Sequence, residues 1–283
     1  MDSKIVLITG ATSGIGLETA KGLAKLGMSV HFIARDMQKA LHTQKILLAE
    51  SGGRGSKFYL ADLSSQEEIK AVVSKIKSDF QKIDVLINNA GASFDTFQLS
   101  PDGIEMTMAV NYFSMTLLSW SLLDLLKASE QGRIINVSSS AHFLGRMNFE
   151  SFVDSKNYSD PDTYRQSKLA VVLFTKKLSR MLSDTAITVN CLNPGRAKTA
   201  MTSQKMRLVE KLMWHTMMFL FGKSVEEAAQ TSIFLASEPK VSRVSGIYFS
   251  NCKQVKCSRK AENMKLQEEL WQKTLQLCDI IRD

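Results

Sequence analysis

Tyr164 and Lys168, in the segment YRQSK, are two residues whose types and spacing could do acid–base chemistry. At positions i and i+4 of a helix the two side chains would lie on one face. A free phenol titrates near pH ~10. An ammonium about 4 Å away, at an effective dielectric constant of about 20, would contribute roughly 4 kcal/mol, or about 3 pKa units before desolvation opposes it. The alternative is an ordinary amphipathic helix with a half-buried tyrosine and a solvated lysine.

Alternating apolar runs and helical patterns indicate which elements position this pair. The runs are β-branched and apolar on both faces, which is typical of a parallel sheet covered by helices on both sides. Strands are expected at 4–9, 29–34, 57–61, 84–88, 133–138, 188–192 and 246–250, and helices at 15–27, 36–50, 65–80, 104–129, 162–183 and 224–237. We predict an α/β fold, a single Rossmann-type doubly wound domain over 1–283 with a mainly parallel seven-stranded sheet.

Ligands of such sheets bind at the carboxyl ends of the strands. The first expected strand runs into TGATSGIG (9–16), where glycines let the backbone turn tightly and approach a pyrophosphate at a helix N-terminus. The spacing is G-x-x-x-G-x-G rather than G-x-G-x-x-G, and a purely structural turn is the minority alternative. The cofactor contacts expected here are Gly10, Thr12, Ser13, Gly14, Ile15 and Gly16.

The second expected strand ends at Ala34 and is followed by Arg35 and Asp36. An arginine favours a ribose 2′-phosphate, whereas an acidic residue favours a free 2′-hydroxyl. We therefore expect NADP(H) as the preferred cofactor, while Asp36 keeps NAD(H) open. A surface arginine opening a helix is the alternative interpretation of Arg35.

Two further strand ends supply candidate cofactor contacts. Asp62, followed by Leu63, could accept a hydrogen bond from an adenine amino group, and it could also serve as a helix N-cap. After the fourth strand, Asn89, Ala90 and Gly91 form a tight polar exit that would pass beneath the cofactor.

Six motifs, in order, resemble those of the short-chain dehydrogenases/reductases over nearly the whole chain. They are TGATSGIG, NNAG, the asparagine of MAVNYFS, INVSSSAH, YRQSK and NPGRAKT. The resemblance implies that Tyr164 is the catalytic acid/base and that Lys168 lowers its pKa and holds the nicotinamide ribose, and both Tyr164 and Lys168 would contact the cofactor. It also implies that Ser139 bonds the reacting oxygen and that Asn111 positions a water in a proton relay. Ser139 and Tyr164 would contact the substrate, whereas Ser138 would pack or support the turn.

The same resemblance extends past the sixth strand. Pro194 and Gly195 would lie against the nicotinamide, and Thr199 would bond the carboxamide or a phosphate. His142 is expected to be a packed loop histidine, with a substrate contact as the alternative.

The insert 141–163 and several later segments are similar to the retinol dehydrogenase branch, in the group with NADP-dependent retinal reductases. This implies an NADP-dependent enzyme whose substrate is a lipophilic aldehyde, ketone or alcohol. A cofactor-binding sensor without turnover is the alternative, although all four catalytic residues are present. The expected boundaries are a dinucleotide-binding half at about 1–132, a catalytic and substrate half at about 133–250, a lid at about 196–223 and a helical tail at about 258–283.

The segment 206–223 has about ten uninterrupted apolar residues, or roughly 15 Å of helix, too short to cross a bilayer core of about 30 Å. It could wall an apolar pocket, touch a membrane surface as an amphipathic helix, or pack on its own domain or a second subunit. The tail around 260–281 could likewise pack on the domain or on a partner. A homodimer through 104–129 and 162–183 is an expectation from the family.

Net charge and cysteine spacing limit the kinds of binding partner that we expect. The formal net charge is +8, but lysines and arginines are spread along the chain without the basic and aromatic interleaving of a nucleic-acid groove, so no nucleic acid is expected. The four cysteines have no metal-ligand spacing, so no metal is expected. Because the first strand begins near Lys4, we expect a cytoplasmic protein, with peripheral membrane contact as the variant.

Overall fold

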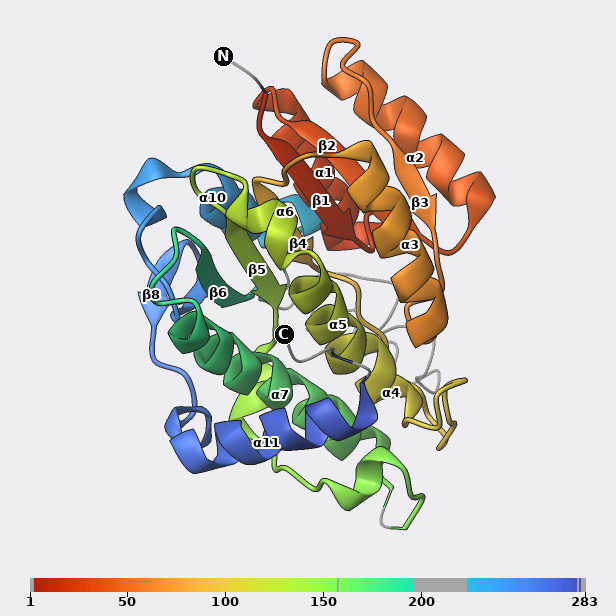
Figure 1. Cartoon of the computed structure of the whole chain (residues 1–283), viewed down its shortest axis with the longest axis vertical. Coiled ribbons are helices and arrows are strands. Elements are labelled where there is room, and N and C mark those ends of the chain that lie inside the picture. The colour runs from red at the N-terminus through yellow and green to blue at the C-terminus, as the bar shows by residue number, and fades with distance from the viewer. Residues whose placement is uncertain (1–2, 157, 196–222, 279, 281–283) are drawn as a thin grey trace.

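The computed structural model describes residues 3–156, 158–195, 223–278 and 280. Its centre is an eight-stranded sheet in the order β3-β2-β1-β4-β5-β6-β7-β8 (Figure 1). The strands are β1 (Ile5–Thr9), β2 (Ser29–Ala34), β3 (Phe58–Leu60), β4 (Val85–Asn88), β5 (Arg133–Val137), β6 (Thr188–Asn193), β7 (Tyr248–Ser250) and β8 (Lys253–Val255). All neighbours pair in parallel except β7 and β8, so the expected mainly parallel α/β fold is confirmed.

The sheet has one strand more than the seven predicted. β8 turns back antiparallel onto β7 through Asn251 and Cys252, whose φ angles of 53° and 59° lie in the left-handed region. All three β8 residues are exposed. Because β8 has no buried face, its sequence carries neither an apolar run nor an alternation, and periodicity could not reveal it.

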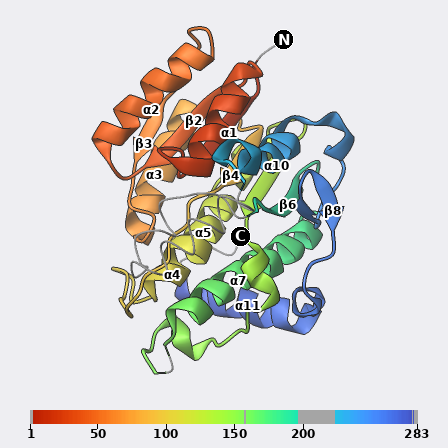
Figure 2. The same ribbon diagram turned by 180° about the vertical axis from the view of Figure 1, so that it is seen from behind.

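Helices cover both faces of the sheet, which gives three layers (Figures 1 and 2). The helices are α1 (Gly14–Lys25), α2 (Met37–Glu50), α3 (Gln66–Asp79), α4 (Met106–Met108), α5 (Ser114–Ser121), α6 (Leu123–Lys127), α7 (Asp160–Met181), α10 (Val225–Ser237) and α11 (Met264–Leu277). One apolar core lies between the sheet and α1, α2 and α10. A second lies beneath α3, α5 and α7.

The helix expected over 104–129 is interrupted. A π-helical turn at Ala109–Phe113 separates α4 from α5, and α6 follows after Leu122. Glu105 is fully buried and caps the N-terminus of α4. Its two carboxylate oxygens accept from the N–H groups of Thr107 (2.9 Å) and Met108 (2.8 Å). Asn111 lies within this turn and is buried.

The C-terminal tail packs on the chain's own helices, one of the two alternatives left open by the sequence. Trp271 of α11 contacts Trp120 of α5 and Phe174 of α7, with ring centroids 5.2 and 6.3 Å apart. In Figure 1, α11 crosses directly over α7. The tail therefore covers part of the helical face through which the homodimer was expected to form.

In the part of the chain that the structure describes, no helix is both long and apolar enough to cross a bilayer.

Candidate active site at the carboxyl edge of the sheet

The carboxyl ends of β1 and β4 are joined by hydrogen bonds. The hydroxyl of Thr9 accepts from the N–H groups of Asn89 and Ala90, both at 3.0 Å. The side-chain amide of Asn89 donates to the carbonyls of Thr9 (2.9 Å) and Gly10 (3.1 Å). The NNAG exit is therefore fixed against the glycine turn, as expected for two segments that share one ligand.

Glycine is required in this turn because neighbouring backbone atoms lie too close to leave room for a side chain. Gly10 and Gly14 have φ angles of 68° and 54°. A Cβ on Gly16 would lie 2.1 Å from the Gly10 carbonyl oxygen, and one on Gly10 would lie 2.9 Å from Ala90 Cα. Side chains here would fill the cradle that a pyrophosphate needs.

The N-terminus of α1 differs from those of the neighbouring helices. Ser13, at its N-cap, makes no side-chain capping bond, whereas Asp36 caps α2 and Ser65 caps α3. First-turn N–H groups of an uncapped helix point outward and, with the helix dipole, favour an anion. The turn therefore fits the pyrophosphate of a dinucleotide.

Arg35 and Asp36 are used differently by the fold. The Asp36 carboxylate accepts from the Lys39 N–H at 3.0 Å and begins α2. The Arg35 side chain is exposed at the end of β2. The acidic group is therefore engaged by the fold, whereas Arg35 is open to solvent at the carboxyl end of β2.

Asp62 is not the helix N-cap that its sequence position allowed. Its carboxylate accepts from the Ser64 N–H at 2.8 Å, and Ser65 caps α3 by accepting from Glu68. Asp62 thus shapes the loop before α3. Leu63 is partly buried and packs on the core below.

Tyr164 and Lys168 lie one turn apart in α7. Lys168 Nζ is 5.7 Å from the centroid of the Tyr164 ring and donates to the Val137 carbonyl, at the end of β5, at 3.1 Å. The Lys168 side chain is only 5 % exposed. Burial lowers the pKa of Lys168 to about 8.

The expected lowering of the Tyr164 pKa by Lys168 is not what this structure shows. Burial raises the pKa of the phenol, and a hydrogen bond with Ser139 opposes this shift. Burial also disfavours the charged form of Lys168, so its ammonium is a weaker counter-charge for the phenolate than a solvated lysine would be. Tyr164 is therefore protonated at neutral pH, the state of a proton donor.

The three adjacent serines, Ser138, Ser139 and Ser140, differ in burial. Ser138 is buried, and its hydroxyl donates to the Lys168 backbone carbonyl at 2.8 Å, which holds β5 against α7. Ser139 is partly exposed; its Oγ accepts from the Ala141 N–H at 3.2 Å, and its hydroxyl interacts with the Tyr164 phenol, which lowers the phenol pKa. The packing role of Ser138 is confirmed, and Ser139 is the serine that faces the tyrosine.

Asn111 connects the NNAG loop to α7. Its side chain accepts from the Ala92 N–H (2.7 Å) and donates to the Ala92 carbonyl (2.8 Å) and the Ser167 hydroxyl (3.0 Å). A Cβ on Gly91 would lie 3.3 Å from both Asn111 Oδ1 and Lys168 Nζ. A side chain at position 91 would therefore crowd both groups.

Asn193 and Ser167 take part in the site, although sequence reasoning did not assign them. Asn193 Oδ1 accepts from the N–H groups of Ser140 (3.3 Å) and Gly195 (3.1 Å), and so joins the serine loop to the Pro-Gly turn. An asparagine before Pro-Gly is a turn signal that could have identified it. Ser167 had no distinguishing pattern within the helix.

The Pro-Gly turn follows β6, and Gly195 has a φ angle of 90°. Thr199 and residues 196–222 of the expected lid lie outside the described residues.

His142 is fully buried, and its ring packs between Phe143 (4.1 Å) and Tyr248 (4.6 Å). The expectation of a packed loop histidine is confirmed.

The fold and the site define a class of protein. The family model for short chain dehydrogenases matches residues 4–208, and the chain belongs to this family of oxidoreductases.

Within the family, its relatives include retinol dehydrogenases. It is 38% identical over 281 residues to retinol dehydrogenase 13 of Mus musculus, covering 98% of this chain and 84% of the relative. It is 35% identical to retinol dehydrogenase 12 of Mus musculus, covering 98% and 87%. Among solved structures, it is similar to an uncharacterised protein from Mycobacterium paratuberculosis, with a TM-score of 0.77, 27% identity and coverage of 97% and 92%.

Proposed function

We propose that the chain is an NADP(H)-dependent reductase and dehydrogenase of lipophilic carbonyl compounds and alcohols, built as one domain. The observation that carries the proposal is the assembly of Ser139, Tyr164, Lys168 and Asn111 beside a glycine turn that fits a pyrophosphate. The lipophilic character of the substrate is inferred from the names of the retinol dehydrogenase relatives.

When bound, the nicotinamide supplies the hydride for a carbonyl or accepts it from an alcohol. Reduction leaves negative charge on the former carbonyl oxygen, so the site must supply a proton and hydrogen-bond donors. Tyr164, protonated at neutral pH because burial raises its pKa, donates that proton. Ser139, which bonds the phenol, holds the oxygen in line. Asn111 Oδ1 and Lys168 Nζ both lie next to Gly91, and Lys168 is one helical turn from Tyr164, so these two groups would hold a proton relay that resupplies the phenol.

The preference for NADP(H) is supported by the end of β2. Arg35 is exposed there, and its guanidinium matches a 2′-phosphate. The neighbouring Asp36 is engaged as the cap of α2, so it is less available to a 2′-hydroxyl.

The first experiment is NADPH oxidation at about 340 nm with all-trans-retinal, medium-chain aldehydes and aromatic ketones, repeated with NADH. Tyr164→Phe should lower kcat by about 10²–10⁴-fold, the usual contribution of a positioned acid, and leave NADPH affinity unchanged. Tyr248→Phe is the matched control, because the buried Tyr248 hydroxyl has no hydrogen-bond partner within the described part of the chain. Full activity of Tyr164→Phe would refute the catalytic assignment.

A further inference from the structure

His142 joins the catalytic serine to the C-terminal segment. Its Nδ1 lies 2.7 Å from the Ser139 carbonyl oxygen, and its Nε2 lies 3.1 Å from the backbone nitrogen of Ser258, 116 residues further along the chain. Because a carbonyl can only accept and an amide N–H can only donate, Nδ1 must carry the proton and Nε2 must be bare. The geometry therefore selects one neutral tautomer.

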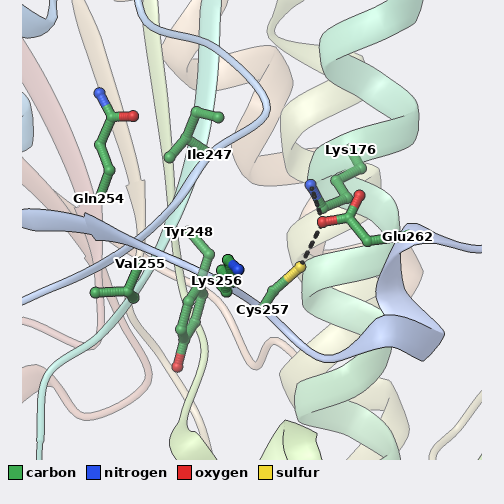
Figure 3. Close-up of a pocket in the computed structure, with 8 residues that line it drawn as sticks. All are labelled: Lys176, Ile247, Tyr248, Gln254, Val255, Lys256, Cys257 and Glu262. Atoms are coloured by element: carbon green, nitrogen blue, oxygen red, sulfur yellow. Dashed lines mark hydrogen bonds and ion pairs between the residues drawn. The ribbon is translucent and has the colours of Figure 1, made fainter.

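The segment that supplies Ser258 is itself anchored to α7. The Glu262 carboxylate lies 3.1 Å from Lys176 Nζ on α7 and accepts from the Cys257 thiol at 3.1 Å. Figure 3 shows this group beside Tyr248, in a pocket of about 340 Å³. Since the Tyr248 ring also contacts His142, the imidazole is enclosed by parts of the chain that are fixed to α7 and the sheet.

A second bond from the same segment holds the other end of the loop that follows Ser139. That loop is the 3-10 helix Ser140–Phe143, and Lys260 Nζ donates to the Gly145 carbonyl just beyond it at 2.7 Å. A Cβ on Gly145 would lie 2.6 Å from the Arg165 carbonyl oxygen, so the loop sits directly on the turn of α7 that follows Tyr164. Small displacements of the loop would thus change the separation of Ser139 from Tyr164.

We propose that His142 is a positioning residue: as the Nδ1–H tautomer it fixes the Ser139 backbone to the C-terminal segment and so sets the serine hydroxyl against Tyr164. This role rests on the proposed function of Ser139 and Tyr164. It also makes the segment from Cys257 to Glu262 a functional part of the site, although it contributes no group to the chemistry.

Three variants at position 142 distinguish the effects of its bond to the Ser139 carbonyl and its bond from the Ser258 N–H. His142→Phe keeps a ring between Phe143 and Tyr248 but removes both bonds. His142→Asn places an amide donor near the Nδ1 position and retains the bond to the Ser139 carbonyl. His142→Gln places an amide oxygen near the Nε2 position and retains only the bond from Ser258.

We expect kcat to fall at least about tenfold in His142→Phe, which loses both bonds, and by less in His142→Asn and His142→Gln, each of which keeps one, with NADPH affinity within twofold of the wild type in all three; a loss of about 1.4 kcal/mol corresponds to that tenfold. Equal activity of all three variants and the wild type would overturn the proposal. Losses of kcat that parallel a loss of NADPH affinity or of thermal stability would also overturn it.

NMR measurements that need no enzymatic turnover test the positioning role of His142 independently of the proposed function. Imidazole ¹⁵N chemical shifts of the intact protein should show His142 as the neutral Nδ1–H tautomer, and an Nε2–H tautomer or a charged ring would overturn the proposal. In parallel, the Tyr164 ¹³Cζ titration should move to higher pH in His142→Phe, because the Ser139 bond that lowers the phenol pKa is weakened, and should move less in His142→Asn, which keeps the bond to the Ser139 carbonyl. No movement in His142→Phe would refute the positioning role even for a protein that turned over no tested carbonyl.

Discussion

At the scale of single residues, burial controls the acid–base properties of the site more than proximity does. Tyr164 and Lys168 are neighbours on α7, yet burial raises the pKa of the phenol and lowers that of the ammonium. Burial shifts each group toward its neutral form relative to its ordinary pKa, in keeping with the cost of placing charge in a poorly solvated site. A bound dinucleotide and a substrate oxygen would enter a site in which Tyr164 still holds its proton.

The shifted pKa of Lys168 predicts a pH dependence of stability. Its pKa is about 8 in the folded chain and 10.5 in the ordinary state, so between these values the unfolded state binds more protons than the folded one. The free energy of unfolding contributed by this group therefore rises with pH, by about 2–3 kcal/mol from pH 7.5 to 10, and is lost again as the pH falls through 8.

Urea unfolding of the wild type and of Lys168→Met across this pH range measures that contribution as the difference between the two proteins. The wild type should gain stability relative to the variant toward high pH. A difference that stays constant with pH would mean that Lys168 is normally solvated.

Substitutions at Arg35 and Asp36 form a matched pair that tests the preference for NADPH over NADH. Arg35→Ala should weaken NADPH binding by about 10–100-fold and leave NADH nearly unaffected, because hydrogen bonds to a charged group contribute about 1.5–3 kcal/mol. Asp36→Asn preserves a good N-cap for α2 and should change neither affinity strongly. Fluorescence titration of both cofactors tests this, and an NADPH affinity unchanged by Arg35→Ala would contradict the role of Arg35.

At the scale of elements, the glycine turn predicts an asymmetry between two Gly→Ala substitutions. Gly16→Ala would force a methyl group to within 2.1 Å of the Gly10 carbonyl, whereas a Cβ on Gly55 meets nothing within 4 Å. Gly16→Ala should cost about 1–3 kcal/mol of stability by overpacking and, since the turn must open, weaken NADPH binding by at least about 100-fold. Gly55→Ala should be neutral in both denaturation and binding assays. Similar behaviour of the two variants would show that the turn is not closely packed.

Elements with one strong pattern were predictable from the sequence. The strand expected at 29–34 coincides with β2, since its residues are buried and β-branched or apolar along almost the whole run. The helix at 104–129 was wrong in its continuity, because apolar periodicity does not distinguish the wider turn at Ala109–Phe113 from an α-helix. The candidate residues could be placed in order along the chain, but their separations depend on how these turns are built.

At the scale of the whole molecule, the sequence indicated which strand ends meet but not what supports them from a distance. The topology brings the ends of β1, β4, β5 and β6 to one edge, as the alternation of strands and helices predicted. The bond from Ser258 to His142 could not be inferred, because no local pattern links residues 116 positions apart. The same holds for the buried Tyr112 hydroxyl, 2.7 Å from Thr274 Oγ1, which ties the π-helical turn beside Asn111 to α11.

A ligand that spans several elements stabilises the folded molecule as a whole, and this predicts a shift that requires no substrate. NADPH at about 100 times its Kd should add about 2.7 kcal/mol to the free energy of unfolding. If Arg35 accounts for a 10–100-fold preference, NADH at the same concentration should add only about 0.4–1.4 kcal/mol. Chemical denaturation followed by tryptophan fluorescence measures both shifts, and Tyr164→Phe should still bind NADPH and retain them, since the variant keeps the ring and loses only the hydroxyl. Equal shifts for the two cofactors would contradict the assignment of Arg35 to a 2′-phosphate, and no shift with either would contradict dinucleotide binding at the glycine turn.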